Sequence, residues 1–472
     1  MKNKISATFF LVLLVVVGLG SLQFLPDIQV QETSLRKVDL LADIRLDEPE
    51  PDLEILADSD TLALPALPPS LPPSISPAEK PVFIDSCQAG MECIQDYADS
   101  THHGMKAFYE ALENIDSMNR PVRIAYFGDS FIEGDILTAD LREKFQEKYG
   151  GSGVGYVPIT SNVAGFRPTV IHRFSNWKSH CVTDSVGFNR VYQGIANRYF
   201  NAAANASITL VGEDKYASYL DTCDVSTFYL LTPDSIRVVA KVNGSDIKEF
   251  SFRGDSTLQA LTVEGRIGKV TWMVRTSTPS SFYYAATMDP HRGVVVDNFS
   301  TRGSSGQQIG SIPLSMLKKH NELRPYDLIV LHYGLNVAFK QGVNYTYYKN
   351  GMTPVIEKLQ RAFPSASILV VGIGDREYKD KHGNLRTIPG VKNLIKYQQA
   401  LAAENHVGFW NLYRAMGGEG SIVDMVNAQP PMANFDYTHI NFRGGKHIAE
   451  LLFDALMHGK DQYDKRKAYE MQ

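Results

Sequence analysis

One short apolar run constrains the fold of this chain more than any other stretch. Residues 122–127 (Val-Arg-Ile-Ala-Tyr-Phe) are rich in β-forming residues, and the run ends abruptly at Gly128-Asp129-Ser130. This pattern predicts a buried strand followed by a tight turn that glycine permits. Because open α/β sheets bind ligands at the carboxyl ends of their strands, Ser130 would lie where chemistry is expected. Such a tripeptide more often simply ends a strand, so partners for a serine nucleophile must come from elsewhere in the chain.

The chain around this run alternates strands and helices. An apolar residue recurs every fourth position from Leu137 to Tyr149 and predicts a helix directly after the turn. Another helix is expected at 95–115. From residue 293 the alternation resumes, with strands expected at 293–298, 326–333, 367–374 and 408–412, and helices at 307–323, 345–363, 391–404 and 445–458. Repeated strand-helix alternation predicts an α/β domain with three layers, a parallel sheet and right-handed crossovers.

A region of different texture interrupts this alternation between 166 and 292. Apolar residues alternate along 236–242, and Asn243-Gly244 supplies the turn of a hairpin. The region predicts an inserted all-β domain, a sandwich, that divides the α/β domain into 83–165 and 293–460. It carries few convergent charged groups, so we expect it to bind or shield rather than to react. Its aromatic residues fit a core better than a sugar-binding platform.

The N-terminal segment, residues 1–26, predicts a membrane helix. Lys2 and Lys4 precede an uncharged stretch from Ile5 to Leu25. As a helix this stretch is about 30 Å long, enough to cross a bilayer, and the lysines would keep its start in the cytoplasm. The remaining chain would then lie outside the cytoplasmic membrane, in the periplasm or beyond. The alternative is a cleaved signal peptide with Gly18 and Gly20 before the cut, which would release the protein.

Two further segments fit no packed core. Residues 27–82 are acidic and then proline-rich, which predicts a semi-rigid spacer. Residues 461–472 are charged and are expected to be frayed. The net charge of −5, without a long basic run, argues against a nucleic-acid partner. The glycine-rich run at 150–155 follows a helix rather than a strand, so no dinucleotide cofactor is expected.

The four cysteines suggest disulfides rather than a metal site. In an exported chain the natural pairing is Cys87 with Cys93 and Cys181 with Cys223. Their spacings match no zinc pattern, so no metal is expected. His102 and His103 are adjacent and do not share a helix face, which makes them poor joint ligands.

The partners that a serine nucleophile needs follow later strands. His439 can accept the Ser130 proton, and Asp436, three residues earlier, can orient the imidazole. The expected oxyanion donors are the Ser130 and Gly306 N–H groups and the Asn336 amide.

Other polar residues near these loops are expected to be structural. His332 is expected to pack on its strand, and Asp375 and Arg376 fit a surface turn better than a pocket lining.

These residues resemble a known family. Gly128-Asp129-Ser130, Gly306, Gly334-Leu335-Asn336 and Asp436-x-x-His439 match, in order, the four blocks of the SGNH (GDSL-type) hydrolases. The resemblance implies a flavodoxin-like sheet and the roles given above for serine, glycine, asparagine and histidine. Val337 stands where the third block usually has aspartate, and Gly303 is the alternative to Gly306 in the second block.

A narrower resemblance implies the reaction. The stretches 409–420 and 436–444 are similar to those of peptidoglycan O-acetylesterases and their exported relatives, some of which carry a carbohydrate-module-like β domain inserted in the hydrolase. The expected function is removal of O-acetyl groups from a cell-envelope polysaccharide. The alternatives are a lipase or thioesterase, a polysaccharide O-acetyltransferase, or a non-catalytic wall-binding protein on the same scaffold. The sequence leaves the oligomeric state open.

Overall fold

The computed structural model describes residues 29–30, 33–34, 83–184 and 186–471. The chain divides into two compact units, Met1–Lys80 and Pro81–Gln472. In the first unit the described residues form strands β1 (Gln29–Val30) and β2 (Thr33–Ser34), which pair in antiparallel fashion. The expected membrane segment 1–26 lies outside the described residues. Among the residues that are described, no helix is both long and apolar enough to span a bilayer.

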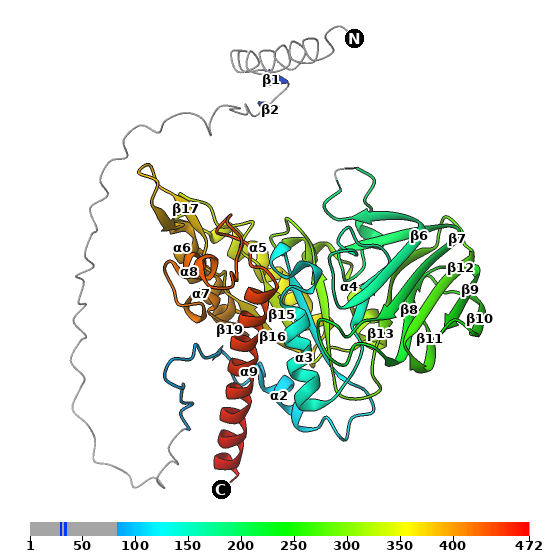
Figure 1. Cartoon of the computed structure of the whole chain (residues 1–472), viewed down its shortest axis with the longest axis horizontal. Helices are drawn as coiled ribbons and strands as arrows, with labels where there is room; N and C mark the ends of the chain where they lie inside the picture. The colour runs from blue at the N-terminus through cyan, green and yellow to red at the C-terminus, as the bar shows by residue number, and fades with distance from the viewer. Residues whose placement is uncertain (1–28, 31–32, 35–82, 185, 472) are drawn as a thin grey trace, which may run out of the picture. The chain divides into compact units, whose positions relative to one another are not determined.

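A six-stranded sheet forms the centre of the second unit (Figure 1). Its order is β14 (Val294–Ser300), β4 (Val122–Gly128), β15 (Leu328–His332), β16 (Ser367–Val371), β19 (Gly408–Trp410) and β3 (Gln95–Asp96). The first five strands are parallel, and β3 is antiparallel to β19. In chain order the parallel strands run 2-1-3-4-5, the order of flavodoxin-like sheets. The predicted parallel α/β sheet is confirmed, and Ser130 follows β4 at the point where this winding changes direction.

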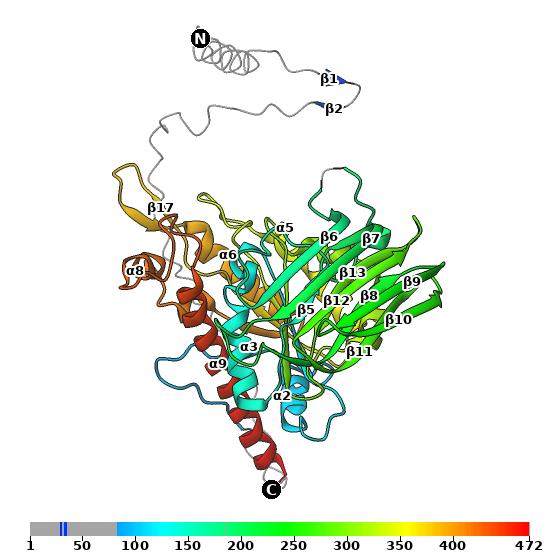
Figure 2. The ribbon, with the colours of Figure 1, turned by 45° about the vertical axis from the view of Figure 1, so that its right-hand side comes forward.

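Helices cover both faces of the parallel sheet. Alternate residues of a strand point to opposite faces, so Ile124 and Tyr126 share one apolar core while Ala125 and Phe127 share another. The first core is closed by α2 (Lys106–Glu113), α3 (Thr138–Tyr149) and α9 (Phe442–Glu470). The second is closed by α4 (Leu314–Leu323), α5 (Thr346–Ala362) and α6 (Pro389–Glu404). Figures 1 and 2 show α3 and α9 side by side in the first layer.

A separate antiparallel region joins nine strands. They are β5 (Gly155–Pro158), β6 (Val170–Cys181), β7 (Arg198–Gly212), β8 (Cys223–Leu231), β9 (Ser235–Val242), β10 (Asp246–Arg253), β11 (Leu258–Ile267), β12 (Lys269–Thr276) and β13 (Phe282–Met288). The expected range of 166–292 leaves out β5, which pairs with β13.

This antiparallel region folds over its own core. Trp272 of β12 stacks on Phe228 of β8 with ring centroids 5.3 Å apart. Those two strands are three positions apart in the sheet order β12-β7-β13-β8, and neighbouring strands lie about 4.8 Å apart. The sheet must therefore bend back so that its two halves face each other across apolar side chains. Figure 1 shows this region on the right, with β15 and β16 of the parallel sheet to its left.

Smaller elements connect the main ones. They are the 3-10 turns η2 (Ser130–Asp135), η3 (Arg190–Tyr192) and η4 (Gln307–Ser311), the hairpin β17 (Glu377–Lys379) and β18 (Leu385–Thr387), and the short helices α7 (Leu412–Ala415) and α8 (Ser421–Asn427). The helix expected at 307–323 is interrupted at Pro313, which separates η4 from α4.

The prediction of a helix at 95–115 was wrong over the first half of that range. Gln95 and Asp96 form β3, and the helix α2 begins only at Lys106. Asp96 accepts hydrogen bonds from the Ala98 and Met105 N–H groups, and Asp99 accepts from Thr101 and His102. These side chains offer the backbone a turn in place of helical hydrogen bonds.

Two further expectations were wrong. Cys87 and Cys93 are disulfide-bonded as expected, but Cys181 and Cys223 are both free. The segment from 461 is not frayed, because α9 continues to Glu470 and packs there against earlier parts of the chain. Gln462 and Tyr463 are buried in this last part, and the Ser86 N–H donates to Gln462 Oε1 at 2.9 Å.

Candidate active site

Ser130 lies on a tight turn at the carboxyl end of β4. A Cβ atom at Gly128 would come within 2.8 Å of the Ile132 side chain and 3.1 Å of the His332 carbonyl oxygen, so any larger residue here would force these neighbours to shift. Asp129 then caps the turn η2 by accepting a hydrogen bond from the Phe131 N–H at 3.0 Å. The local sequence therefore fixes the direction in which Ser130 leaves the sheet.

The structure brings Ser130, His439 and Asp436 into one hydrogen-bonded chain. Ser130 Oγ lies 3.2 Å from His439 Nε2, and His439 Nδ1 lies 2.8 Å from Asp436 Oδ2. The other carboxylate oxygen, Oδ1, accepts from the His439 and Thr438 N–H groups at 3.0 Å each. Partial burial would raise the pKa of Asp436, but these donors outweigh it and hold the pKa below its usual value. Asp436 is therefore poised to stay ionised beside the imidazole.

A close helix contact places His439 next to Ser130. Helix α9 begins three residues after His439, and a Cβ atom at its Gly445 would lie 1.7 Å from the Ile136 carbonyl oxygen. Glycine at this position lets the start of α9 approach the chain just beyond η2. The Gly444-Gly445 pair is the sequence signal for this approach.

Asn336 and Gly306 lie in the loops after β15 and β14. The Asn336 Nδ2 group donates to Asp129 Oδ2 and to the Ser304 carbonyl oxygen, at 3.1 Å in both cases. The Gly306 N–H donates to Ser304 Oγ at 3.0 Å, and its φ of +89° favours glycine. Ser304 thus accepts hydrogen bonds from two of the three expected oxyanion donors, from Gly306 at its hydroxyl oxygen and from Asn336 at its carbonyl oxygen. Gly303, the alternative to Gly306, is exposed.

Asp129 has a structural role that we did not predict from the sequence. Its side chain contacts both the Phe131 N–H and Asn336, and the residue is only 1 % exposed. Burial raises the pKa of Asp129 to about 6, although the Phe131 N–H, the charge of His439 and the Asn336 amide each act to lower it. The position of Asp129 beside Ser130 in the turn was the available signal.

Arg376 and Asp375 do not lie in a surface turn as expected. Asp375 is buried and accepts hydrogen bonds from Thr387 Oγ1 and the Ile422 N–H. Arg376 Nη1 donates to the Leu335 and Ala338 carbonyl oxygens at 3.1 and 3.2 Å, and its Nε lies 3.3 Å from Thr438 Oγ1. Arg376 therefore ties the loop that carries Asn336 to the loop that carries His439. No local pattern predicts this, because all its partners are distant in sequence.

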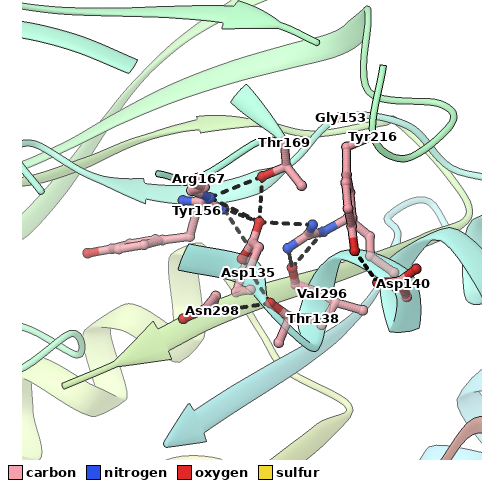
Figure 3. A network of polar contacts seen from close by, with 12 residues as sticks. Asp135, Thr138, Asp140, Gly153, Tyr156, Arg167, Thr169, Tyr216, Val296 and Asn298 are labelled. Atoms are coloured by element: carbon pink, nitrogen blue, oxygen red, sulfur yellow. Dashed lines mark hydrogen bonds and ion pairs between the residues drawn. The ribbon is translucent and has the colours of Figure 1, made fainter. Parts of the chain in front are cut away.

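A buried polar network surrounds Asp135, the last residue of the turn η2 (Figure 3). Asp135 accepts hydrogen bonds from Thr138 Oγ1 at 2.8 Å, Thr169 Oγ1 at 2.6 Å and Arg167 Nε at 2.9 Å. Burial alone would raise the pKa of Asp135, but Arg167 and Arg142 hold it well below its usual range. Since Arg167 and Thr169 lie in the segment between β5 and β6, this network joins the antiparallel region to the Ser130 turn.

His332 is buried against its strand, as predicted. Its Nδ1 lies 3.0 Å from the Tyr126 hydroxyl, and burial lowers its pKa to about 3. It is therefore neutral and has no contact with Ser130 that would make it a base.

One group among the described residues offers metal-ligand atoms close together. It consists of Asp99, His102 and His406, whose ligand atoms lie within 4.8 Å of one another. Asp99 already accepts from His102 Nδ1 at 2.9 Å and pairs with His406 Nδ1 at 3.2 Å. His406 lies two residues before the amino end of β19, whereas Ser130 follows the carboxyl end of β4, so this group is remote from the serine.

Comparisons with known proteins support the fold. No protein-family model matches the sequence, and no curated protein matches it. A solved structure of a peptidoglycan O-acetylesterase is similar, with 22% sequence identity and a TM-score of 0.63 over 78% of this chain and 99% of that one.

Two other solved structures match smaller parts of this chain. A family two carbohydrate esterase from Clostridium thermocellum matches with 11% identity and a TM-score of 0.26, over 61% of this chain and 97% of its own. A GDSL-like lipase from Parabacteroides merdae matches with 16% identity and a TM-score of 0.26, over 35% and 74%. Only the first of these structures supports a conclusion, and that conclusion concerns the fold: this chain has the same fold as that peptidoglycan O-acetylesterase.

Proposed function

We propose that the chain is a serine esterase of the SGNH type that removes O-acetyl groups from a cell-envelope polysaccharide, with peptidoglycan as the leading candidate. The observation that carries this proposal is the hydrogen-bonded chain from Ser130 through His439 to Asp436. Similarity of fold to a peptidoglycan O-acetylesterase supports the choice of substrate. A binding protein would need none of these three residues in this geometry.

The proposed reaction begins with attack by Ser130 Oγ on the acetyl carbonyl carbon. His439 Nε2, 3.2 Å away, takes the hydroxyl proton as the new C–O bond forms. Asp436 keeps the proton on His439 Nδ1, so Nε2 is free to accept, and it stabilises the imidazolium that results. The carbonyl oxygen becomes an oxyanion. It accepts the hydrogen bonds that Gly306 N–H and Asn336 Nδ2 donate to Ser304 in this structure.

The intermediate collapses when the ester C–O bond breaks. The sugar oxygen leaves as an alcohol after receiving the proton from His439, and Ser130 keeps the acetyl group. A water molecule then gives its proton to His439 and attacks the acetyl-enzyme. Acetate is released, and the Ser130 hydroxyl is restored by the same proton.

We also propose that residues 1–26 anchor the protein in the cytoplasmic membrane with the catalytic unit outside it. The support is the uncharged stretch from Ile5 to Leu25 behind two lysines, followed by a proline-rich spacer. N-terminal sequencing of the mature protein from isolated membranes tests this. A mature chain that begins near Ser21 would show cleavage and release instead.

The activity is tested by labelling with a fluorophosphonate and by hydrolysis of p-nitrophenyl acetate. We expect the wild type to be labelled and to release nitrophenol, and Ser130→Ala to do neither above background. Ser245→Ala, which changes an exposed serine of a hairpin turn, is the matched control and should behave as wild type. Wild-type hydrolysis by Ser130→Ala would refute the mechanism.

The substrate is tested separately by acetate release. O-acetylated peptidoglycan, acetylated xylan and an acetylated lipid are offered at equal ester concentrations, with and without a free sugar acceptor. Faster release from peptidoglycan supports the proposal. Preference for the lipid, or transfer of acetate to the added sugar, would favour a lipase or an acetyltransferase.

A further inference from the structure

A polar cavity of about 600 Å³ lies beside the Ser130 turn, between the parallel sheet and the antiparallel region. The parallel-sheet side contributes Glu133 from η2 and Thr301 and Arg302 from the loop after β14. The antiparallel side contributes Ser179 of β6 and Arg198 of β7. A cavity of this size suits a small ligand or one segment of a larger one.

The strand register places the wall of the cavity beside the turn that carries Ser130. Ser300, on its wall, pairs with Gly128, and the Thr301 N–H donates to the Gly128 carbonyl oxygen at 2.9 Å. Gly128 is two residues before Ser130. Since neighbouring strands are about 5 Å apart, a sugar whose ester meets Ser130 could place a substituent of the same or the next ring in the cavity.

The charged groups that line the cavity are not all paired. Arg302 pairs with Glu133, and Arg167 pairs with Asp135. Arg198 differs, because its Nε donates to the Ala196 carbonyl oxygen at 3.3 Å, and among the described residues no carboxylate forms an ion pair with it. Asp184, the remaining carboxylate of the lining, accepts from the Cys181 N–H at 2.7 Å.

A half-buried guanidinium without a carboxylate partner is an incomplete site. Removing the charge of Arg198 from bulk water is unfavourable, and a carboxylate ligand with two oxygens would match the planar fork of the guanidinium. Hydroxyl groups such as those of Ser179 and Thr301 lie along the same lining and can bond to sugar hydroxyls. A neutral glycan would leave Arg198 without a counter-charge.

We infer that this cavity is a subsite for a carboxylate-bearing part of the polysaccharide, and that Arg198 binds the carboxylate. The substrate class is then an acidic O-acetylated glycan, in which the acid is carried on the sugar or on a peptide attached to it. This inference rests on the proposed esterase function. It gives the antiparallel region a part in substrate selection, because Arg198 and Ser179 come from its strands.

The test compares the kcat/KM for an O-acetylated, carboxylate-bearing glycan with that for p-nitrophenyl acetate in the same preparation. We expect Arg198→Gln to lower the ratio of the two values by about tenfold to a hundredfold, as loss of one charge-assisted hydrogen-bonded contact does. Arg253→Gln, an exposed arginine of strand β10, is the matched control and should leave the ratio unchanged. An unchanged ratio in Arg198→Gln would overturn the inference.

A second measurement uses the wild-type protein with an altered substrate. The carboxylates of the same glycan are converted to neutral amides while the acetyl esters are kept. We expect the wild type to lose the same tenfold to hundredfold in kcat/KM, and equal rates on the two glycans would overturn the inference. If the wild type hydrolyses neither p-nitrophenyl acetate nor any acetylated glycan, the proposed function itself fails, which is a different result.

Discussion

The side-chain amide of Asn336 donates a hydrogen bond to Asp129 Oδ2 at 3.1 Å. This contact joins the residue before the candidate nucleophile to a candidate oxyanion donor 207 positions later in the chain. It means that the turn at the end of β4 orients two parts of the site at once. Changes at the two residues should therefore have different effects, on catalysis at Asn336 and on the pH dependence of stability at Asp129.

Replacement of Asn336 by alanine should lower kcat for p-nitrophenyl acetate by about 10²–10³-fold, with a smaller effect on KM. The amide would bond to the oxyanion only when charge develops on it, so its loss affects the transition state more than the bound ester. Steady-state kinetics measure the split. Asn350→Ala, at an exposed position of α5, is the control. A large rise in KM with an unchanged kcat would show that Asn336 binds the substrate instead.

Replacement of Asp129 by asparagine should change how stability depends on pH. The pKa of Asp129 is raised to about 6 in the folded protein from a value near 4 in the unfolded chain. The folded state therefore binds the proton more tightly, and between pH 4 and 6 the free energy of unfolding falls as pH rises, by about 3 kcal/mol from this group. Above pH 6 the contribution is constant.

Urea unfolding of wild type and Asp129→Asn between pH 4 and 7 measures this effect. The difference between the two proteins should shift by about 3 kcal/mol across this range in favour of the variant at higher pH. Asp116→Asn, at an exposed position away from the site, is the matched control. A constant difference between wild type and Asp129→Asn would mean that Asp129 does not titrate in this range.

Arg376 should act as a positioning residue. Its guanidinium holds the Leu335 and Ala338 carbonyl oxygens and Thr438 together, so Arg376→Gln should misalign the loops of Asn336 and His439. We expect kcat to fall by about tenfold or more with little change in KM, and fluorophosphonate labelling of Ser130 to slow in parallel. Arg376→Lys should restore part of the rate, because one ammonium can still bond to a carbonyl. If Arg376→Gln lowered the thermal stability without changing kcat, the role of Arg376 would be purely structural.

The parts of the fold that follow from local pattern were predicted from the sequence. The runs that became β4, β15 and β16 are apolar on both faces, and each is covered by helices on both sides. Because strand ends in a parallel sheet meet at one edge, the order of Ser130, Asn336 and His439 along the chain was enough to expect them together. Their hydrogen-bonded geometry needed the structure.

The parts that were missed depend on partners far away in sequence. Arg376 is half-buried and donates to two carbonyl groups and to Thr438, and none of these acceptors is within 30 positions of it. The predicted disulfide between Cys181 and Cys223 rested only on the even number of cysteines. Both thiols are free, and they lie in strands whose registers are set by hydrogen bonds to strands distant in sequence. Asp96 and Asp99 changed an expected helix into a strand and a turn through contacts to nearby N–H groups, which apolar spacing does not reveal.

Arg324 couples the antiparallel region to the parallel sheet through buried ion pairs. Its Nη2 donates to Asp289 Oδ1 at 2.9 Å and to Asp297 Oδ1 at 2.8 Å, and all three side chains are buried. Asp289 follows β13 in the antiparallel region, whereas Asp297 is in β14 of the parallel sheet. Arg324→Met removes the charge that compensates both carboxylates, so we expect a loss of about 3–5 kcal/mol in the free energy of unfolding.

Urea denaturation followed by far-UV circular dichroism and by tryptophan fluorescence measures this loss. Trp177 and Trp272 lie in the antiparallel region and Trp410 lies in the parallel sheet, so tryptophan fluorescence reports on both regions. A single transition that coincides in the two signals would show that the two regions unfold together. Lys392→Met breaks the exposed pair with Glu419 and should cost less than about 1 kcal/mol. Adding Asp289→Asn and Asp297→Asn to Arg324→Met should recover part of the loss, because the two uncompensated charges are then removed. A loss at Arg324 no larger than that at Lys392 would mean that the two carboxylates are stabilised by other groups.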